Sequence, residues 1–411
     1  MLKELCVYYI SQVINLPNKG NTAMTLLNDF KKKLIVIFLI SLSTHVSSNA
    51  AVPLEVTIQE TIEEFDIPAM AAMTIYGDKI VDSAVAGVRV RGTDEKATLD
   101  DLWHLGSCTK SMTATIAGRL IEKGKLKWES TIAEVLPEFG ETILPAYRNV
   151  TLRELLEHRS GIPGDVMQQE MWKDAFERVG GELSAHEQHR LFCRDTLQLE
   201  PHGKVGTYQY SNQGYAVAGY MCAVAANDTF ENVMQRELFE PLNMKSVGYG
   251  APLSRGDKNL CGHSGDGKPV LLPFDNPIGM APAGLVHCTM EDWSKYAAEH
   301  LLGSKGKSDL LSKQTFDTLH TPSVHDENTY AMGWIATTRP WGNGRVLMHS
   351  GSNTMFFCTV WIAPNRNFAV LVACNQGPPA SAAACDAVVT TCIVNEITRQ
   401  NALKSNQPKG D

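Results

Sequence analysis

The stretch Trp103-His104-Leu105-Gly106-Ser107-Cys108-Thr109-Lys110 decides how the chain is interpreted, because it runs directly into a helical pattern. Apolar residues then recur at helical spacing until Gly124 interrupts them: Ile116, Ala117, Leu120 and Ile121. We therefore predict a helix that begins at Ser107, just after Gly106. Residues three apart share a face of a helix, so Lys110 would place its amine beside the Ser107 hydroxyl.

This position suits a nucleophile and its base. A helix N-terminus presents unpaired N–H groups and a partial positive charge, which favour a developing oxyanion. The same charge, together with burial, favours a neutral lysine, and only a neutral Lys110 could accept the proton of Ser107. An isolated Ser-x-x-Lys is weak evidence, since serine is a common helix cap and lysine a common solvated residue. The rest of the chain has to support the pair.

Composition describes an ordinary globular protein. The 411 residues suffice for one large or two ordinary domains, with 44% hydrophobic and 20% charged residues. The net charge of -8 and the pI of about 5.9 offer no basic face for a nucleic acid. We therefore exclude nucleic acid as a partner.

The N-terminal fifty residues have the pattern of an export signal. Lys31-Lys32-Lys33 precede an apolar run over residues 34–42, and small residues follow at 47–51. We predict cleavage after Ala50 and a periplasmic or extracellular protein; an uncleaved N-terminal membrane anchor is the alternative. The lead before Lys31 is long for a signal, and Met24 would be a more natural start.

The cysteines do not form the pattern of a disulfide scaffold. Cys6 lies in the lead, which leaves an odd number at irregular spacings, without any Cys-x-x-Cys. Because most lie in apolar surroundings, we predict buried free thiols. Cys108 adjoins the proposed nucleophile, but neighbouring helical positions point about 100° apart.

Strand patterns occupy both ends of the chain and helical patterns its middle. The predicted strands and helices include a helix at 57–65, strands at 69–75 and 80–88, helices at 152–157 and from 212, strands at 345–349, 354–362 and 368–374, and a helix at 380–396. We predict an α+β fold with one antiparallel sheet built from both chain ends, flanked by helices, and a large helical insertion. The predicted division is a lead and signal over 1–50 and one catalytic domain over 53–400, with a sheet subdomain (about 53–100 and 275–400) and a helical subdomain (about 101–274).

Two further polar clusters could join Ser107. Tyr210 and Asn212 flank Ser211 at a loop-to-helix junction, where a phenol could shuttle a proton and an amide could orient the lysine and a carbonyl. An aromatic core residue and a helix cap would be the structural alternative. Later, His349-Ser350-Gly351-Ser352 lies on a predicted strand. Gly351 would let a substrate backbone approach, and the strand N–H groups could supply a second oxyanion donor.

Together the three clusters resemble the motifs of the penicillin-recognising serine hydrolases, which include class C β-lactamases, D-alanyl-D-alanine carboxypeptidases and related esterases. Ser107-Cys108-Thr109-Lys110 resembles the Ser-x-x-Lys motif. Tyr210-Ser211-Asn212 resembles Tyr-x-Asn, and His349-Ser350-Gly351 stands where Lys-Thr-Gly or His-Thr-Gly would. Residues 155–162 and 281–285 are similar to further segments of the family. The likeness covers about residues 55–400.

The resemblance implies a β-lactamase/transpeptidase-like fold and a role for each residue. Ser107 would attack the carbonyl, Lys110 and Tyr210 would handle its proton, and Asn212 would position the acyl group. The remaining members would complete the substrate cleft: His349, Gly351 and Ser352. One departure is that a histidine replaces the lysine of the third motif, which shifts the expectation away from an efficient lactamase.

The expected activity is therefore hydrolysis of a β-lactam or D-alanyl peptide amide, with a small-molecule or peptidoglycan-derived substrate and neither cofactor nor metal. Two alternatives remain: a carboxylesterase of short-chain esters on the same fold, and a non-catalytic cell-wall-binding protein. Ser107 and Lys110 argue against the latter. The loops at 167–181 and 262–274 would shape the pocket, and the sequence does not fix the oligomeric state.

Overall fold

The protein is described by a computed structural model, in which residues 52–164, 170–179, 181–256, 258–324, 327 and 329–405 are described. The predicted signal at 31–51 and the predicted start at Met24 lie outside these residues. Residues 52–405 lie within a single compact unit.

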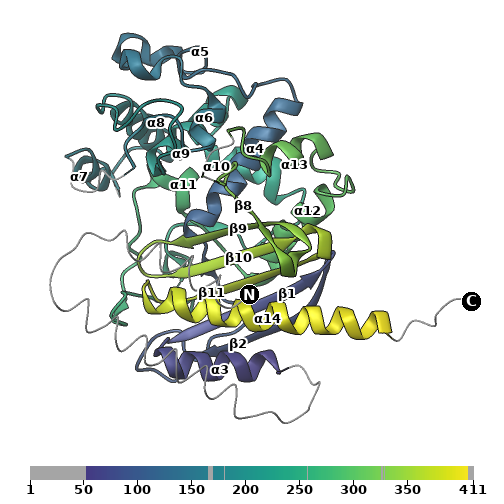
Figure 1. The fold of residues 1–411 in the computed structure, drawn as a ribbon. Coiled ribbons are helices and arrows are strands. Elements are labelled where there is room, and N and C mark those ends of the chain that lie inside the picture. The colour runs from purple at the N-terminus through teal and green to yellow at the C-terminus, as the bar shows by residue number, and fades with distance from the viewer. Residues whose placement is uncertain are drawn as a thin grey trace, which may run out of the picture. The chain divides into compact units, whose positions relative to one another are not determined.

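A six-stranded antiparallel sheet is the centre of this unit (Figure 1). Its order is β2-β1-β11-β10-β9-β8, so strands from the two ends of the chain meet where β1 pairs with β11. The strands of this sheet are β1 (Ala69–Tyr76), β2 (Lys79–Gly87), β8 (Ile335–Arg339), β9 (Gly344–Ser352), β10 (Phe357–Ala363) and β11 (Phe368–Cys374). β11 is buried at every position and β1 at all but its last, as befits central strands covered on both faces.

The remaining strands are short and the helices lie mainly between the two strand regions. The short strands are β3 (Trp103–His104), β4 (Gly248–Tyr249), β5 (Gly262–His263), β6 (Pro269–Val270) and β7 (Val286–Cys288). The helices are α3 (Leu54–Phe65), α4 (Thr109–Glu122), α5 (Ile132–Val135), α6 (Leu152–Leu156), α7 (Glu170–Glu177), α8 (Ala185–Thr196), α9 (Asn212–Ala226), α10 (Phe230–Met234), α11 (Ala281–Gly284), α12 (Met290–Gly303), α13 (Lys313–Leu319) and α14 (Ala380–Ser405).

Each face of the sheet has its own hydrophobic core, because successive side chains of a strand point to opposite faces. Met70 and Ala72 of β1 pack with residues of α3 and α14. Ala71 and Met73 face the other way, into a larger core shared with α4, α9 and α12. Figure 1 shows α14 lying along the sheet on the side opposite α4 and α12.

The predicted α+β class, with an antiparallel sheet made from both chain ends and a largely helical middle, is confirmed. β11 has the predicted bounds, and the first hairpin differs by one residue at its ends. The last helix runs nine residues beyond the predicted Glu396, since neither Gly nor Pro interrupts the chain there.

Three predicted boundaries were wrong near the functional motifs. The helix predicted to begin at Ser107 starts with a 3₁₀ turn, Gly106–Cys108, and α4 proper begins at Thr109. The strand predicted from Thr354 begins at Phe357, because Thr354 has φ of +73° and the chain is still turning. β9 correspondingly extends to Ser352, which brings the third motif to the end of a strand.

Among the described residues, α14 is the helix that is long and apolar enough to span a membrane by length and composition. Its inner face is buried against β10 and β11, through residues that include Ala384, Val388 and Cys392. That packing is typical of a core helix.

Candidate active site

Ser107 lies in the 3₁₀ turn that leads into α4, and its side chain is partly exposed between buried neighbours. Gly106 has φ of +47°, a conformation that suits glycine. A Cβ at Gly106 would lie only 2.3 Å from the backbone nitrogen of Ser352. The turn therefore requires glycine, and it leaves the Ser107 hydroxyl accessible beside the end of β9.

Lys110 is fully buried on the first turn of α4 and has three polar neighbours. Its Nζ lies 2.9 Å from Ser107 Oγ, 2.7 Å from Asn212 Oδ1 and 2.7 Å from the carbonyl oxygen of Ala283. Burial holds the pKa of Lys110 well below its usual 10.5, against an opposing influence from Cys108.

These neighbours match the hydrogen-bonding capacity of a neutral amine. An uncharged lysine has two N–H donors and one lone pair, whereas a carbonyl oxygen can only accept. In that neutral state Asn212 Oδ1 and Ala283 O take the two N–H groups and the lone pair faces the Ser107 hydroxyl, whereas a charged Nζ would donate to all three oxygens. This is the arrangement of a base ready to accept the serine proton.

Tyr210 is a further close neighbour of the lysine. Lys110 Nζ is 4.9 Å from the centre of its ring. Burial raises the pKa of Tyr210 above its usual 10, although a hydrogen bond with Ser107 opposes the rise. The phenol therefore keeps its proton at neutral pH and can donate a hydrogen bond or a proton near Ser107.

The second motif is held by its own hydrogen bonds. Ser211, rather than Asn212, caps α9, since its Oγ accepts from the N–H of Gly214 at 3.0 Å. The N–H of Ser211 donates to His158 Nδ1 at 3.0 Å, so His158 holds the backbone just before α9. Asn212 is thereby free to accept from Lys110.

The backbone of the third motif, at Gly351, lies directly against the backbone of the turn that contains Ser107. A Cβ at Gly351 would lie 1.9 Å from the carbonyl oxygen of Leu105 and 2.8 Å from the nitrogen of Ser107. Only glycine permits this approach. The nitrogens of Ser107 and Ser352 therefore belong to adjoining turns, as two oxyanion donors require.

His349 is buried, and both of its ring nitrogens have protein partners. Nδ1 lies 2.6 Å from the carbonyl oxygen of Ser350, and Nε2 lies 3.1 Å from the hydroxyl of Tyr330. Since the carbonyl only accepts, Nδ1 carries a proton, and in a neutral ring Nε2 would accept from Tyr330. The histidine at the lysine position is thus engaged by the protein itself.

Several residues of the site were missed by sequence reasoning. Ala283 lies in the segment that resembled the family, but nothing indicated that its carbonyl would contact Lys110. Tyr330 and Asp275 belong to no motif: Tyr330 contacts His349, which lies 19 residues later, and Asp275 contacts His104 and Asn353. Only the folded sheet and loops bring them to the site.

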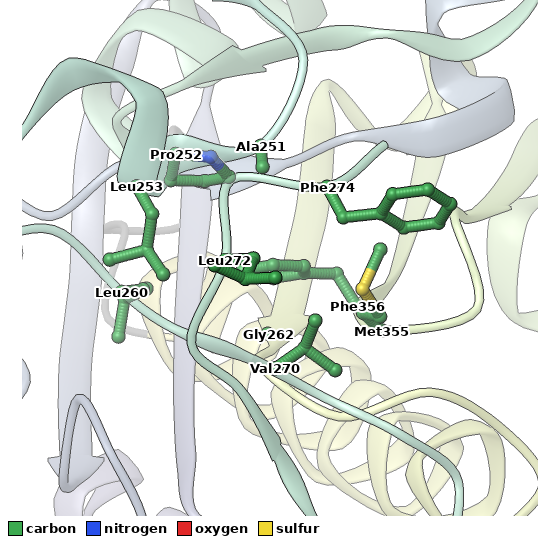
Figure 2. Close-up of a pocket in the computed structure, with 10 residues that line it drawn as sticks. All are labelled: Ala251, Pro252, Leu253, Leu260, Gly262, Val270, Leu272, Phe274, Met355 and Phe356. Carbon is green, nitrogen blue, oxygen red and sulfur yellow. The ribbon is translucent and has the colours of Figure 1, made fainter. Parts of the chain in front are cut away.

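The two segments predicted as pocket-shaping loops contact each other, but the prediction of a loop at 167–181 was wrong for residues 170–177, which form α7. Phe274 stacks on Phe176, with ring centres 5.6 Å apart. Figure 2 shows an apolar hollow in which Leu272 lies close to Phe356. The residues lining it are Ala251, Pro252, Leu253, Leu260, Gly262, Val270, Leu272, Phe274, Met355 and Phe356.

The prediction of buried free thiols is confirmed for the nine cysteines among the described residues. Within the part of the chain that the structure describes, no group of three or more His, Cys, Asp or Glu side chains is placed to hold a metal ion.

Comparison with known proteins gives one family. The model of the Beta-lactamase family matches residues 54–390. Penicillin-binding protein 4 of Amycolatopsis lactamdurans is 25% identical over 338 residues, which are 76% of this chain and 82% of that protein. Unguisins hydrolase ungD' of Aspergillus campestris is 24% identical over 342 residues, 77% of this chain but only 60% of that longer protein.

Solved structures agree. The octameric penicillin-binding protein homologue from Pyrococcus abyssi is 25% identical with a TM-score of 0.66, covering 86% of this chain and 81% of that one. The class C beta lactamase from Rhodobacter sphaeroides shares the fold, with a TM-score of 0.65, 21% identity and coverage of 84% and 99%. On the family match over residues 54–390, the chain belongs to the Beta-lactamase family, the superfamily of serine β-lactamases and penicillin-binding proteins.

Proposed function

We propose that the protein is a serine hydrolase that works through an acyl-enzyme on Ser107. The observation that carries this proposal is the environment of Lys110, whose two acceptors and one hydroxyl neighbour suit a neutral base. A non-catalytic cell-wall-binding protein would gain nothing from burying a lysine beside an exposed serine, because burial disfavours its charged form.

The reaction follows from this geometry. Lys110 Nζ takes the Ser107 proton as Oγ attacks the substrate carbonyl carbon, and the N–H groups of Ser107 and Ser352 stabilise the oxyanion. Collapse breaks the bond to the leaving group, which receives a proton through Lys110 or Tyr210. A water then attacks the acyl group, loses its proton to the same base, and releases the acid and Ser107.

For the substrate, we propose the amide of a β-lactam or a D-alanyl peptide. The support is the resemblance of the three motifs and the name of the penicillin-binding relative. Asn212 would contact the acyl group from the side of Lys110, and the strand with Gly351 would lie along the substrate backbone.

A second candidate is a carboxylesterase of short-chain esters, and the position of His349 favours it. Both ring nitrogens of His349 already have protein partners. The third motif thus lacks the lysine cation that would attract the carboxylate of a penicillin or peptide. A neutral ester does not need that charge.

We also propose that the protein is exported. The support is the basic, apolar and small-residue sequence that ends near Ala50. Cell fractionation with and without residues 1–50 tests this directly: loss of the exported fraction in the truncated chain is expected, and unchanged export would overturn it.

The test of the chemistry is intact mass after mixing with benzylpenicillin, a D-alanyl-D-alanine peptide or a short-chain aryl ester. An adduct that maps to Ser107 and is absent in Ser107→Ala supports the acyl-enzyme. Ser111→Ala is the matched control, a buried serine of α4 whose Oγ donates to the Cys108 carbonyl. The reagent that reacts identifies the substrate class; an adduct retained by Ser107→Ala would refute the assignment.

A further inference from the structure

The two oxyanion donors of the proposed function lie on separate parts of the chain. Ser107 belongs to the turn before α4, and Ser352 ends β9. Because Gly106 and Gly351 occupy the contact between them, the two backbones touch without a side chain in between, and small shifts of either segment would change the distance between the two nitrogens. Side chains that hold each segment from behind can therefore contribute to this distance.

One buried carboxylate reaches both turns. Asp275 Oδ2 lies 2.8 Å from His104 Nε2 and accepts a hydrogen bond from Asn353 Nδ2 at 3.3 Å. The Asp275 side chain is 6% exposed, and His104 is fully buried. Burying this carboxylate is costly unless it is paired, and its other oxygen, Oδ1, accepts from the backbone N–H of Asn276 at 2.7 Å, so these partners together hold it in one place.

On the nucleophile side, His104 links Asp275 to the turn that contains Ser107. Its Nδ1 accepts a hydrogen bond from the N–H of Gly106 at 3.1 Å. A neutral histidine that accepts at Nδ1 carries its proton on Nε2, the nitrogen that faces Asp275. The contact is a short electrostatic one, because Nε2 makes no hydrogen bond of standard angle.

On the β9 side, Asn353 holds the turn immediately after Ser352. Its Oδ1 accepts from the N–H groups of Met355 at 3.2 Å and Phe356 at 3.0 Å. These two bonds fix which end of the amide is the donor, so Nδ2 is directed to Asp275.

We infer that Asp275 is a positioning residue that sets the distance between the two oxyanion donors, the N–H groups of Ser107 and Ser352, through His104 and Asn353. This inference rests on the proposed acyl-enzyme function. An oxyanion exists only in the transition state and intermediate, so a misplaced donor slows acylation while substrate binding is little changed.

The test compares Asp275→Ala with Asp292→Ala. Asp292 is a matched control, since its side chain is also 6% exposed and it bonds Ser246 and Lys295 away from the site. Single-turnover acylation by the reagent that labels Ser107 gives a limiting rate and a half-saturating concentration. Hydrogen–deuterium exchange of residues 103–108 and 350–356 reports the two turns without any substrate.

For Asp275→Ala we expect the limiting acylation rate to be about 10- to 100-fold lower, because misplacing an oxyanion donor costs less than removing one. The half-saturating concentration should stay within about threefold of wild type. Both turns should exchange faster, and Asp292→Ala should show neither effect. If Asp275→Ala folds poorly, Asp275→Asn keeps the shape and should show a smaller loss of rate in the same pattern.

A rate within about threefold of wild type and unchanged exchange would overturn the inference, as would equal losses in the control. If no reagent acylates wild-type Ser107, the proposed function fails instead. In that case the hydrogen–deuterium exchange of the two turns in Asp275→Ala still tests whether Asp275 positions the backbone. Faster exchange in both turns supports this role, and unchanged exchange refutes it.

Discussion

The two sides of the site differ in what occupies the polar atoms of their motifs. On the lysine side, the partners of Lys110 leave its lone pair directed at Ser107. On the histidine side, Tyr330 and the Ser350 carbonyl occupy both nitrogens of His349. The difference teaches that the groups needed for the proposed activation of Ser107 are already in contact, whereas the histidine of the third motif is hydrogen-bonded within the protein.

Ser107→Ala should have the largest effect, because it removes the atom that attacks. We expect a loss of turnover on the order of 10⁴- to 10⁶-fold. The melting temperature should stay within a few degrees, since the side chain is partly exposed and Gly106 still sets the turn. Steady-state kinetics and calorimetry check both, with Ser111→Ala as the control; retained turnover would remove Ser107 from the mechanism.

Lys110→Met should lower the acylation rate by about 10²- to 10⁴-fold, the range of a lost general base. Lys110→Arg should be no better, because arginine stays protonated. Stopped-flow acylation of the two variants measures the loss, and a change of only a few-fold would show that another group accepts the Ser107 proton.

Stability should also depend on pH through Lys110. Its pKa is lowered in the folded protein, so between that pKa and 10.5 the unfolded chain binds more protons. The unfolding free energy of wild type should therefore rise with pH across this window relative to Lys110→Met. Denaturant unfolding at several pH values measures the difference, and parallel curves would contradict a neutral buried lysine.

Tyr210→Phe should be milder than either lysine variant, with acylation slowed by about 10- to 100-fold, near the low end of proton-transfer effects. The ring that packs near Lys110 is kept, so only the hydroxyl is tested. If the rate on a substrate with a good leaving group is unchanged while a poor one reacts more slowly, the phenol acts on the leaving group.

Tyr330→Phe should have the smallest effect on turnover and the clearest effect on stability. It leaves the buried Nε2 of His349 without its donor, which should cost about 1–3 kcal/mol of unfolding free energy. Turnover of a neutral ester should change by less than about threefold. A large loss with that ester would mean that Tyr330 and His349 take part in the chemistry.

Much of this arrangement could be predicted from local patterns. β11 was predicted to the residue because seven consecutive apolar residues lie between clear turn signals. The contact between Ser107 and Lys110 follows from helical spacing, and it survives the 3₁₀ start of α4 because the two residues remain one turn apart.

The rest depends on contacts between distant parts of the chain. Ala283 contacts Lys110 through its backbone carbonyl. Because every residue has a backbone carbonyl, the residue type at position 283 could not predict this contact. Tyr330 and Asp275 reach the site from loops whose paths are set by tertiary packing. The two contacts of the His349 ring nitrogens likewise depend on the folded positions of β9 and Tyr330, which the sequence does not give.

The central claim is that a buried, neutral Lys110 activates Ser107, and the most direct measurement is the pKa of its amine. An NMR titration of ¹³C-labelled lysine, with the Lys110 signal assigned by its absence in Lys110→Met, provides it. The account predicts a pKa well below 10.5 and a Ser107 acylation rate that falls as pH drops through the same value. A Lys110 signal that titrates at or above 10.5 would contradict it.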